Sequence, residues 1–212
     1  MKKLFLISIL VLFSSLCFAG EKYKGDVQLH GGFDFDKINI EQERRGRTIN
    51  AFMKHNAYDM GLESWHLFAI NDALDLGFSI GCDFSFAFTG IINENGMTGD
   101  VESLVSSSYY IGPALQYNVL SFLSLRTSVG FNEVIIQERA MYDYSSWENR
   151  DCPGFYGEVQ AKFLPNKLFS PVLGYRFSLR FDDKMTDDNG NSLDVKAKDF
   201  SNLLYIGASV NW

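Results

Sequence analysis

The side chains best suited to chemistry are few in this sequence, which has three histidines and three cysteines. None of His30, His55 and His66 has a cysteine, a second histidine or a carboxylate at a spacing typical of a metal site. A bound metal needs several protein ligands. We therefore predict structural roles for these histidines, no metal ligands and no cofactor.

Two cysteines remain beyond the N-terminal segment that contains Cys17. A disulfide between Cys82 and Cys152 would require an oxidising compartment, and their spacing alone does not settle the pairing. We place Cys82 in the middle of a strand, on its outer face, and Cys152 in a loop. We therefore expect two free thiols.

Catalytic groups cannot be brought together from the sequence either, because no nucleophile, general base and orienting group share a recognisable arrangement. The chain has a net charge of -7 and no basic cluster. An acidic chain without a basic patch binds nucleic acid poorly. We predict no catalytic residues, no enzymatic activity and no nucleic-acid partner.

The N-terminus has the order of a secretory signal peptide. Lys2 and Lys3 precede an apolar run at residues 4–13, and the small residues Cys17 and Ala19 follow. The run is shorter than the roughly 20 residues of a spanning helix. We predict a signal peptide at residues 1–19, cleaved after Ala19, and one mature domain at residues 20–212.

A period of two dominates the rest of the chain and is clearest in residues 74–89. Apolar residues occupy the even positions from Leu74 to Phe88, and small or polar residues occupy the odd positions from Asp75 to Thr89. Successive side chains of a strand point to opposite faces. The segment therefore predicts a strand with one apolar and one polar face, longer than the roughly 9–11 residues that cross a bilayer.

The same alternation recurs in eight segments, and the connections between them alternate in length. The short connections lie around residues 71–73, 118–122 and 165–167, and the long polar ones at residues 39–57, 90–106, 137–153 and 183–199. Tight turns on one side and long loops on the other are typical of outer-membrane barrels. We predict an all-β fold, an eight-stranded antiparallel up-and-down transmembrane barrel.

The polar face of the strands carries charges of both signs, which favours a barrel with its apolar face in lipid. An eight-stranded barrel is only wide enough to be filled by side chains, and unpaired buried charges are costly. We predict an internal network of paired charges formed by Asp34, Glu63, Asp83, Arg126, Glu158, Lys162, Arg176 and Arg180. The alternative is a soluble ligand-binding barrel, but aromatic residues near the strand ends are typical of an interfacial girdle.

The last strand ends on an aromatic residue, Trp212, preceded at every second position by Val210, Ala208 and Ile206. This ending resembles the C-terminal signal of bacterial outer-membrane proteins, although phenylalanine is the commoner last residue. The mature chain as a whole resembles the small OmpX-, OmpW- and OmpA-barrel-like group. The resemblance implies an outer-membrane location, contact with lipid and lipopolysaccharide, and recognition of the last strand by the barrel-assembly machinery.

The leading functional hypothesis is a structural or surface-interaction role carried by long extracellular loops. The best contact candidates are Tyr142, Tyr144 and Trp147, because tyrosine and tryptophan offer contact area at low entropic cost. The same residues could instead extend the barrel wall at the level of lipopolysaccharide.

Two other functions remain open. An OmpW-like resemblance suggests a channel for small solutes or hydrophobic molecules, and Pro113 could open the wall because proline removes a ladder hydrogen bond. A lipid-modifying enzyme would resemble an eight-stranded acyltransferase of lipid A, with His55 and Asp59 near the outer rim.

Overall fold

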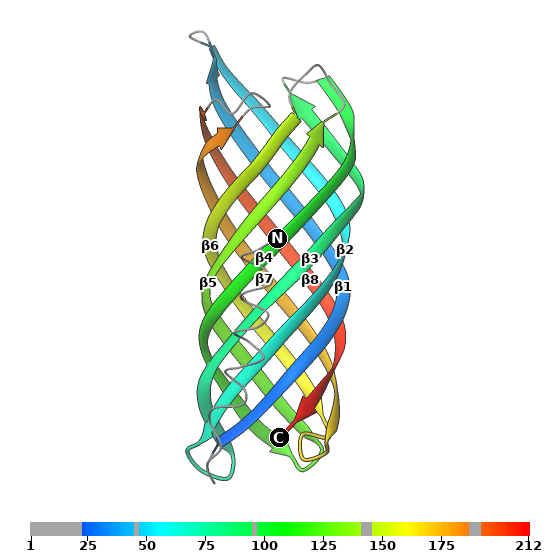
Figure 1. The fold of residues 1–212 in the computed structure, drawn as a ribbon, viewed down its shortest axis with the longest axis vertical. Helices are drawn as coiled ribbons and strands as arrows, with labels where there is room; N and C mark the ends of the chain where they lie inside the picture. Colours follow the sequence, from blue (N-terminus) through cyan, green and yellow to red (C-terminus); the bar gives the residue numbers. More distant parts are fainter. Residues whose placement is uncertain (1–22, 45–46, 95–96, 141–145, 187–191) are drawn as a thin grey trace.

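The computed structural model describes residues 23–44, 47–94, 97–140, 146–186 and 192–212, which together form one β-barrel (Figure 1). The predicted signal peptide, its cleavage site and the first residues of the predicted domain lie outside the described residues. Within the described ranges, no helix is long and apolar enough to cross a membrane.

Eight antiparallel strands form the wall, and each pairs with the next in the chain. They are β1 (Tyr23–Arg44), β2 (Arg47–Ala69), β3 (Leu74–Glu94), β4 (Met97–Leu120), β5 (Leu123–Ala140), β6 (Ser146–Phe163), β7 (Phe169–Thr186) and β8 (Ser192–Asn211). β1 also pairs with β8, from Asp26↔Asn211 to Gln42↔Val195, and this pairing closes the barrel. The predicted eight-stranded up-and-down barrel is confirmed.

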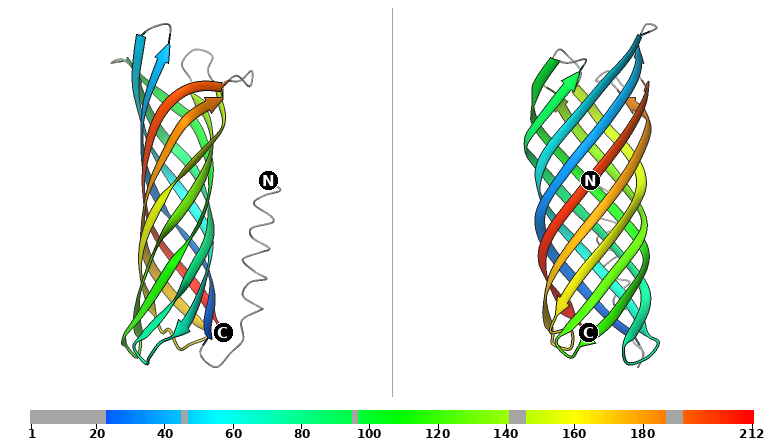
Figure 2. Two further views of the ribbon diagram at one scale, coloured as in Figure 1. Left: turned by 90° about the vertical axis from the view of Figure 1, so that its left-hand side faces the viewer. Right: turned by 180° about the vertical axis from the view of Figure 1, so that it is seen from behind.

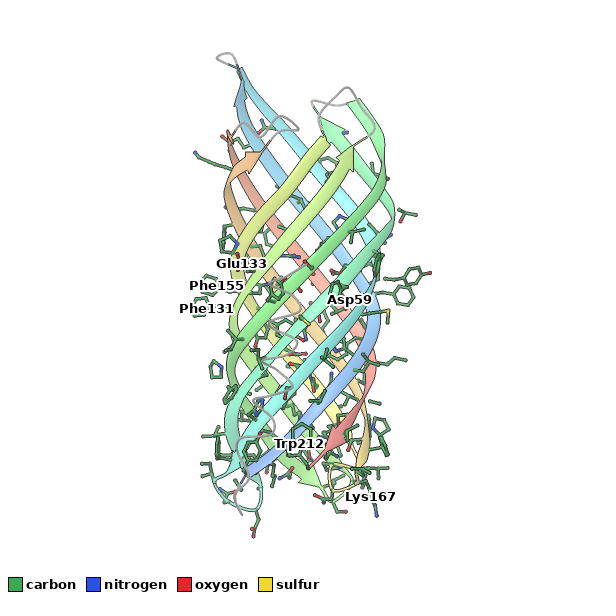
Figure 3. All side chains as sticks on the ribbon, viewed as in Figure 1. Asp59, Phe131, Glu133, Phe155, Lys167 and Trp212 are labelled. Carbon is green, nitrogen blue, oxygen red and sulfur yellow. The ribbon has the colours of Figure 1, made fainter. Side chains whose placement is uncertain are left out.

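The alternation of side chains sets the two faces of the wall. Large apolar side chains are exposed on the outside, including Phe131, Phe155 and Ile206 at 65%, 54% and 70% exposure. Figure 3 shows Phe131 and Phe155 projecting from the outer wall. Many charged side chains, including those of Arg126, Arg176 and Arg180, instead lie buried inside the barrel. An apolar exterior of this kind matches the hydrocarbon of a bilayer rather than water, so the soluble alternative does not fit.

Three short turns and the C-terminus lie at the lower end of the barrel in Figure 1. In the first turn, the side-chain oxygen of Asn71 accepts hydrogen bonds from the backbone N–H groups of Ala73 and Leu74, each at 2.9 Å. Leu164 in the third turn has a φ of 53°, a left-handed conformation that is uncommon for residues with a bulky side chain.

The long polar loops predicted at the other end are mostly strand, which corrects the sequence interpretation. β1 extends to Arg44 and pairs with β2 through Arg47, and β3 and β4 pair as far as Glu94↔Met97. Figure 2 shows these hairpins rising above the body of the barrel, with the β1–β2 hairpin reaching furthest. A strand that has left the bilayer has water on both faces, so its sequence loses the apolar alternation without losing its pairing.

Cys82 and Cys152 are both buried, and neither is part of a disulfide. Cys82 lies in the outward register between Leu62 and Tyr109 of the neighbouring strands. Cys152 lies in β6 opposite Val134, so the prediction of a loop position is wrong. Pro153, the last residue of the predicted connection, likewise pairs with Glu133 within the sheet.

Inside the barrel, large aromatic side chains occupy the space that glycines leave. A Cβ atom added to Gly81 would lie 2.6 Å from Cε2 of Tyr110, and one added to Gly174 would lie 2.5 Å from Cε2 of Tyr205. Each tyrosine ring therefore packs directly on the backbone of another strand. This pairing of glycine with tyrosine lets the narrow interior hold two rings beside its charged groups.

Candidate functional site in the barrel lumen

The lumen holds most of the buried ionisable side chains that the structure describes, arranged in three layers along the barrel axis. All eight residues predicted for the internal charge network point into it and are at most 6% exposed. Their partners, however, include several residues that the sequence analysis did not select.

The lower layer is centred on Asp26. Arg126 donates to both carboxylate oxygens of Asp26, at 2.5 and 3.3 Å, and Lys162 Nζ lies 2.5 Å from Oδ2. The Arg126 guanidinium also stacks over the ring of Trp65, 4.9 Å from its centroid. The Asp26 carboxylate is therefore paired with two cations, and one of these cations packs on a tryptophan ring.

A second carboxylate completes the lower layer near the rim. Asp75 accepts hydrogen bonds from Lys24 Nζ at 2.9 Å and from Gln116 Nε2 at 2.9 Å. Gln116 in turn accepts a hydrogen bond from Arg126 Nε at 2.7 Å. The amide of Gln116 thus links the two carboxylates into one connected network, with three cations for two acids.

The middle layer is organised around Arg176. Its Nη1 pairs with Asp83, and its Nη2 lies 3.0 Å from Glu158 Oε1 and 3.7 Å from Glu63 Oε2. The guanidinium also stacks on the Tyr110 ring at 3.7 Å. One cation therefore serves three carboxylates.

Neutral side chains donate further hydrogen bonds to the carboxylates around Arg176. Tyr205 donates its hydroxyl to Glu158, and Gln160 Nε2 donates to Glu63 at 2.9 Å. His30 lies on the other side of the layer, with Nε2 3.1 Å from Asp83 Oδ1. The ring of His30 also contacts the ring of Tyr205, with 4.5 Å between centroids.

The upper layer is organised around Arg180. The guanidinium contacts Asp36 at 3.2 Å and Asp199 at 3.3 Å. Asp36 also lies 3.0 Å from Nε2 of His55, and Ser201 donates to Asp34 at 2.7 Å. Again one guanidinium serves more than one carboxylate.

No individual pairs were predicted from the sequence, and two arginines of the network contact acids outside the predicted set. Arg126 pairs with Asp26 rather than with one of the predicted acids, and Arg180 pairs with Asp36 and Asp199. Asp26, Asp36 and Asp199 all occupy inward positions of the alternation, so periodicity could have identified them as interior residues. It could not identify their partners: Arg126 reaches Asp26 from a strand that is not adjacent, whereas Asp199 is the register partner of Arg180 on the neighbouring strand.

The histidines also acquire neighbours that sequence spacing did not reveal. His30 on β1 lies beside Asp83 on β3, and 3.9 Å from Asp59 on β2. His55 contacts Asp36, not the Asp59 that the enzyme hypothesis placed with it. His66 stacks on Phe78 with 4.7 Å between ring centroids. The barrel therefore places carboxylates beside two of the three histidines.

The external contact candidates lie at the edge of the described residues. Tyr142 and Tyr144 lie outside them, and Trp147 lies in β6. Whether they form a contact surface stays a prediction.

The predicted assembly signal lies on the strand that closes the barrel. The side chains of Ile206, Val210 and Trp212 are exposed on the outer face, as is Ala208. Trp212 exchanges two backbone hydrogen bonds with Gly25 of β1, at 3.2 and 3.0 Å. The last residue of the chain therefore takes part in barrel closure, at the lower end shown in Figure 3.

Known structures with a similar fold are outer-membrane proteins. The outer membrane protein OprG from Pseudomonas aeruginosa has a TM-score of 0.53 at 14% identity, over 89% of this chain and 96% of that chain. This chain has the fold of the small outer-membrane β-barrels. A major outer membrane protein from Thermus thermophilus has a TM-score of 0.50 at 14% identity, over 90% of this chain and 99% of that one.

Sequence comparisons give no match: no family model and no curated protein matches this chain. The similarity to solved structures therefore concerns the fold, and it confirms the architecture expected from the alternating strands and the C-terminal ending.

Proposed function

We propose that this barrel is a closed structural protein of a bacterial outer membrane whose extracellular hairpins carry a surface-interaction role. The single observation that carries the proposal is the filled lumen, in which Arg126, Arg176 and Arg180 each reach across to carboxylates of other strands. A lumen filled in this way leaves the hairpins above the membrane as the part available to partners.

The orientation follows from the two ends of the barrel. Short turns and the C-terminus lie at the lower end, and the strand extensions lie at the upper end (Figure 1). In outer-membrane barrels, short turns face the periplasm and long segments face outward. We assign the upper end to the cell exterior, with lipopolysaccharide around it, and the Trp212 end to the periplasm, where the assembly machinery would bind.

The OmpW-like alternative required an opening in the wall near Pro113, and the strand pairing there argues against one. Pairing between β4 and β5 stops at Ile111↔Phe131 and resumes at Ala114↔Ser128 in the same register. A Cβ atom added to Gly130 would lie 2.6 Å from the Cα atom of Gly112. The two backbones are therefore in close contact beside Pro113.

Recordings across a planar bilayer test the closed lumen. We expect refolded wild-type protein to give no large, steady conductance. A trimeric porin refolded into the same bilayers is the positive control, because truncating side chains of one layer would leave the other two layers in place. A steady porin-like conductance of the wild type would contradict the proposal.

Binding measurements test the interaction role separately. Cells that display the wild-type barrel are compared with cells that display Tyr142→Ser with Tyr144→Ser, for adhesion to epithelial cells and to immobilised lipopolysaccharide. Loss of adhesion at equal surface density supports contact through the connection between β5 and β6. Unchanged adhesion to both would remove these tyrosines from the proposal.

A further inference from the structure

The middle and upper layers of the lumen contain far more negative than positive charge. Of the buried side chains that the structure describes there, seven are carboxylates and only two are guanidiniums, those of Arg176 and Arg180. The carboxylates are Asp34, Asp36, Asp59, Glu63, Asp83, Glu158 and Asp199. Protonation of both His30 and His55 would still leave three negative charges without a cation. Burial of uncompensated charge is expensive, so the excess carboxylates must either take up protons or gain an additional cation.

Three of the buried groups converge on one point. His30, Asp59 and Asp83 each offer one ligand atom, and these atoms all lie within 4.8 Å of one another. His30 Nε2 is 3.1 Å from Asp83 Oδ1 and 3.9 Å from Asp59 Oδ1. Ligands bound at about 2.1 Å to one metal are separated by roughly 3.0–3.4 Å in octahedral or tetrahedral geometry. The His30–Asp83 separation is therefore already that of two ligands of one metal, and Asp59 would have to move closer to His30.

Asp59 provides an independent indication of a missing ligand. It is 3% exposed, and its Oδ1 atom accepts no hydrogen bond from any described residue. Its other oxygen accepts a hydrogen bond from Ser85 at 2.7 Å. Figure 3 shows Asp59 about midway along the barrel, where water of the bulk solvent cannot satisfy it.

A small cavity is lined by two of the three residues, Asp59 and Asp83. It has a volume of about 20 Å³ and is lined by Asp34, Asp59, Asp83, Asn132 and Arg176, among others. A cavity of at least about 10–15 Å³ can hold one water molecule. There is thus room beside Asp59 for one ion or for a water molecule that completes its coordination.

Gly61 keeps the space beside His30 and Asp83 open. A Cβ atom added at this position would fall on the contact between His30 and Asp83, 2.5 Å from Cε1 of His30. No larger residue could be present without displacing one of the two proposed ligands. The contact between His30 and Asp83 therefore depends on a glycine at position 61 of the wall.

We propose that His30, Asp59 and Asp83 bind one divalent transition-metal ion inside the barrel. Imidazole and carboxylate together suit zinc, manganese or ferrous iron, whereas magnesium and calcium prefer oxygen ligands alone. The second oxygens of both carboxylates are held by other residues, Asp59 by Ser85 and Asp83 by Arg176. Such outer contacts orient metal ligands. The ion would reduce the excess negative charge at the level where the lumen has least compensation.

Metal content of the refolded protein tests the proposal. Wild type is refolded with Zn²⁺, passed over a desalting column and measured for zinc per chain. We expect about one zinc ion per wild-type chain and at least a tenfold loss in Asp59→Asn and in His30→Gln. Asp75→Asn is the matched control, because it neutralises an equally buried carboxylate in the lower layer and should keep its zinc.

X-ray absorption of zinc-loaded wild type supplies a second measurement that does not depend on variants folding. The proposal predicts one imidazole nitrogen among oxygen ligands. Three outcomes would overturn it: no zinc retained by folded wild type, a shell of oxygen alone, or equal zinc in wild type, Asp59→Asn and His30→Gln. The last two outcomes would indicate adventitious binding elsewhere, and none of the three would bear on whether the lumen conducts.

Discussion

The lower layer of the lumen and the two layers above it differ in how completely cations compensate their buried carboxylates. In the lower layer, Asp26 and Asp75 are matched by Arg126, Lys162 and Lys24. In the layers above, Arg176 and Arg180 each contact at least two carboxylates, and Asp59 keeps one oxygen without a hydrogen bond. The lower layer is therefore a compensated plug, whereas the upper two depend on single arginines.

The largest expected effect follows from removing Arg176. In Arg176→Met, Asp83 and Glu158 lose their cation, and breaking a buried pair costs about 3–5 kcal/mol. Urea unfolding of the barrel in lipid vesicles should show this loss in the free energy of unfolding. Arg176→Lys keeps the charge and should recover part of it. A loss below about 1 kcal/mol would mean that the middle layer does not depend on this arginine.

The corresponding change in the lower layer should cost less. In Arg126→Met, Lys162 still pairs with Asp26 at 2.5 Å, so we expect a loss of about 1–3 kcal/mol in the same assay. Removing Lys162 as well should raise the loss to that of Arg176→Met. Equal losses for Arg126→Met and Arg176→Met would remove the contrast between the layers.

Packing in the middle layer can be tested without changing any charge. Gly174→Ala places a methyl group against the Tyr205 ring, and overpacking of this kind costs about 1–3 kcal/mol. Gly157→Ala is the control, because its added Cβ atom would meet only Val129 Cγ1, at 3.9 Å. If both variants unfold at the same urea concentration, the rings are not held by the glycines.

The smallest predicted effect is that of replacing one buried aspartate by asparagine, which should change the free energy of unfolding in opposite directions in the middle and lower layers. With a chelator present, Asp59→Asn removes an uncompensated charge, and the amide oxygen can still accept from Ser85. We expect its free energy of unfolding to rise by about 1 kcal/mol. Asp75→Asn should lower it, because Asp75 is paired with Lys24. Destabilisation by both changes would show that Asp59 is compensated in the apo barrel.

The sequence predicted the wall of this barrel better than its upper end. The alternation in residues 74–89 identified the inward and outward positions of β3 because a bilayer-facing strand must be apolar on one side. The segments around Arg44 and Glu94 lost that signal above the membrane and were interpreted as loops, although they pair as strands. The polarity of a side chain reflects the medium around it. Inside the bilayer a strand must therefore alternate between apolar and polar residues, whereas above the bilayer a paired strand can be polar on both faces.

For the lumen, the period of two was enough to predict which side chains face inward, and their charges implied that they are paired or compensated. The tertiary structure decided the pairs. Arg126 meets Asp26 at a separation of 100 residues, and His30, Asp59 and Asp83 converge from three strands. The reason is geometric: a period of two fixes the face of each side chain, but its height and its partner depend on strand register and on closure of the barrel.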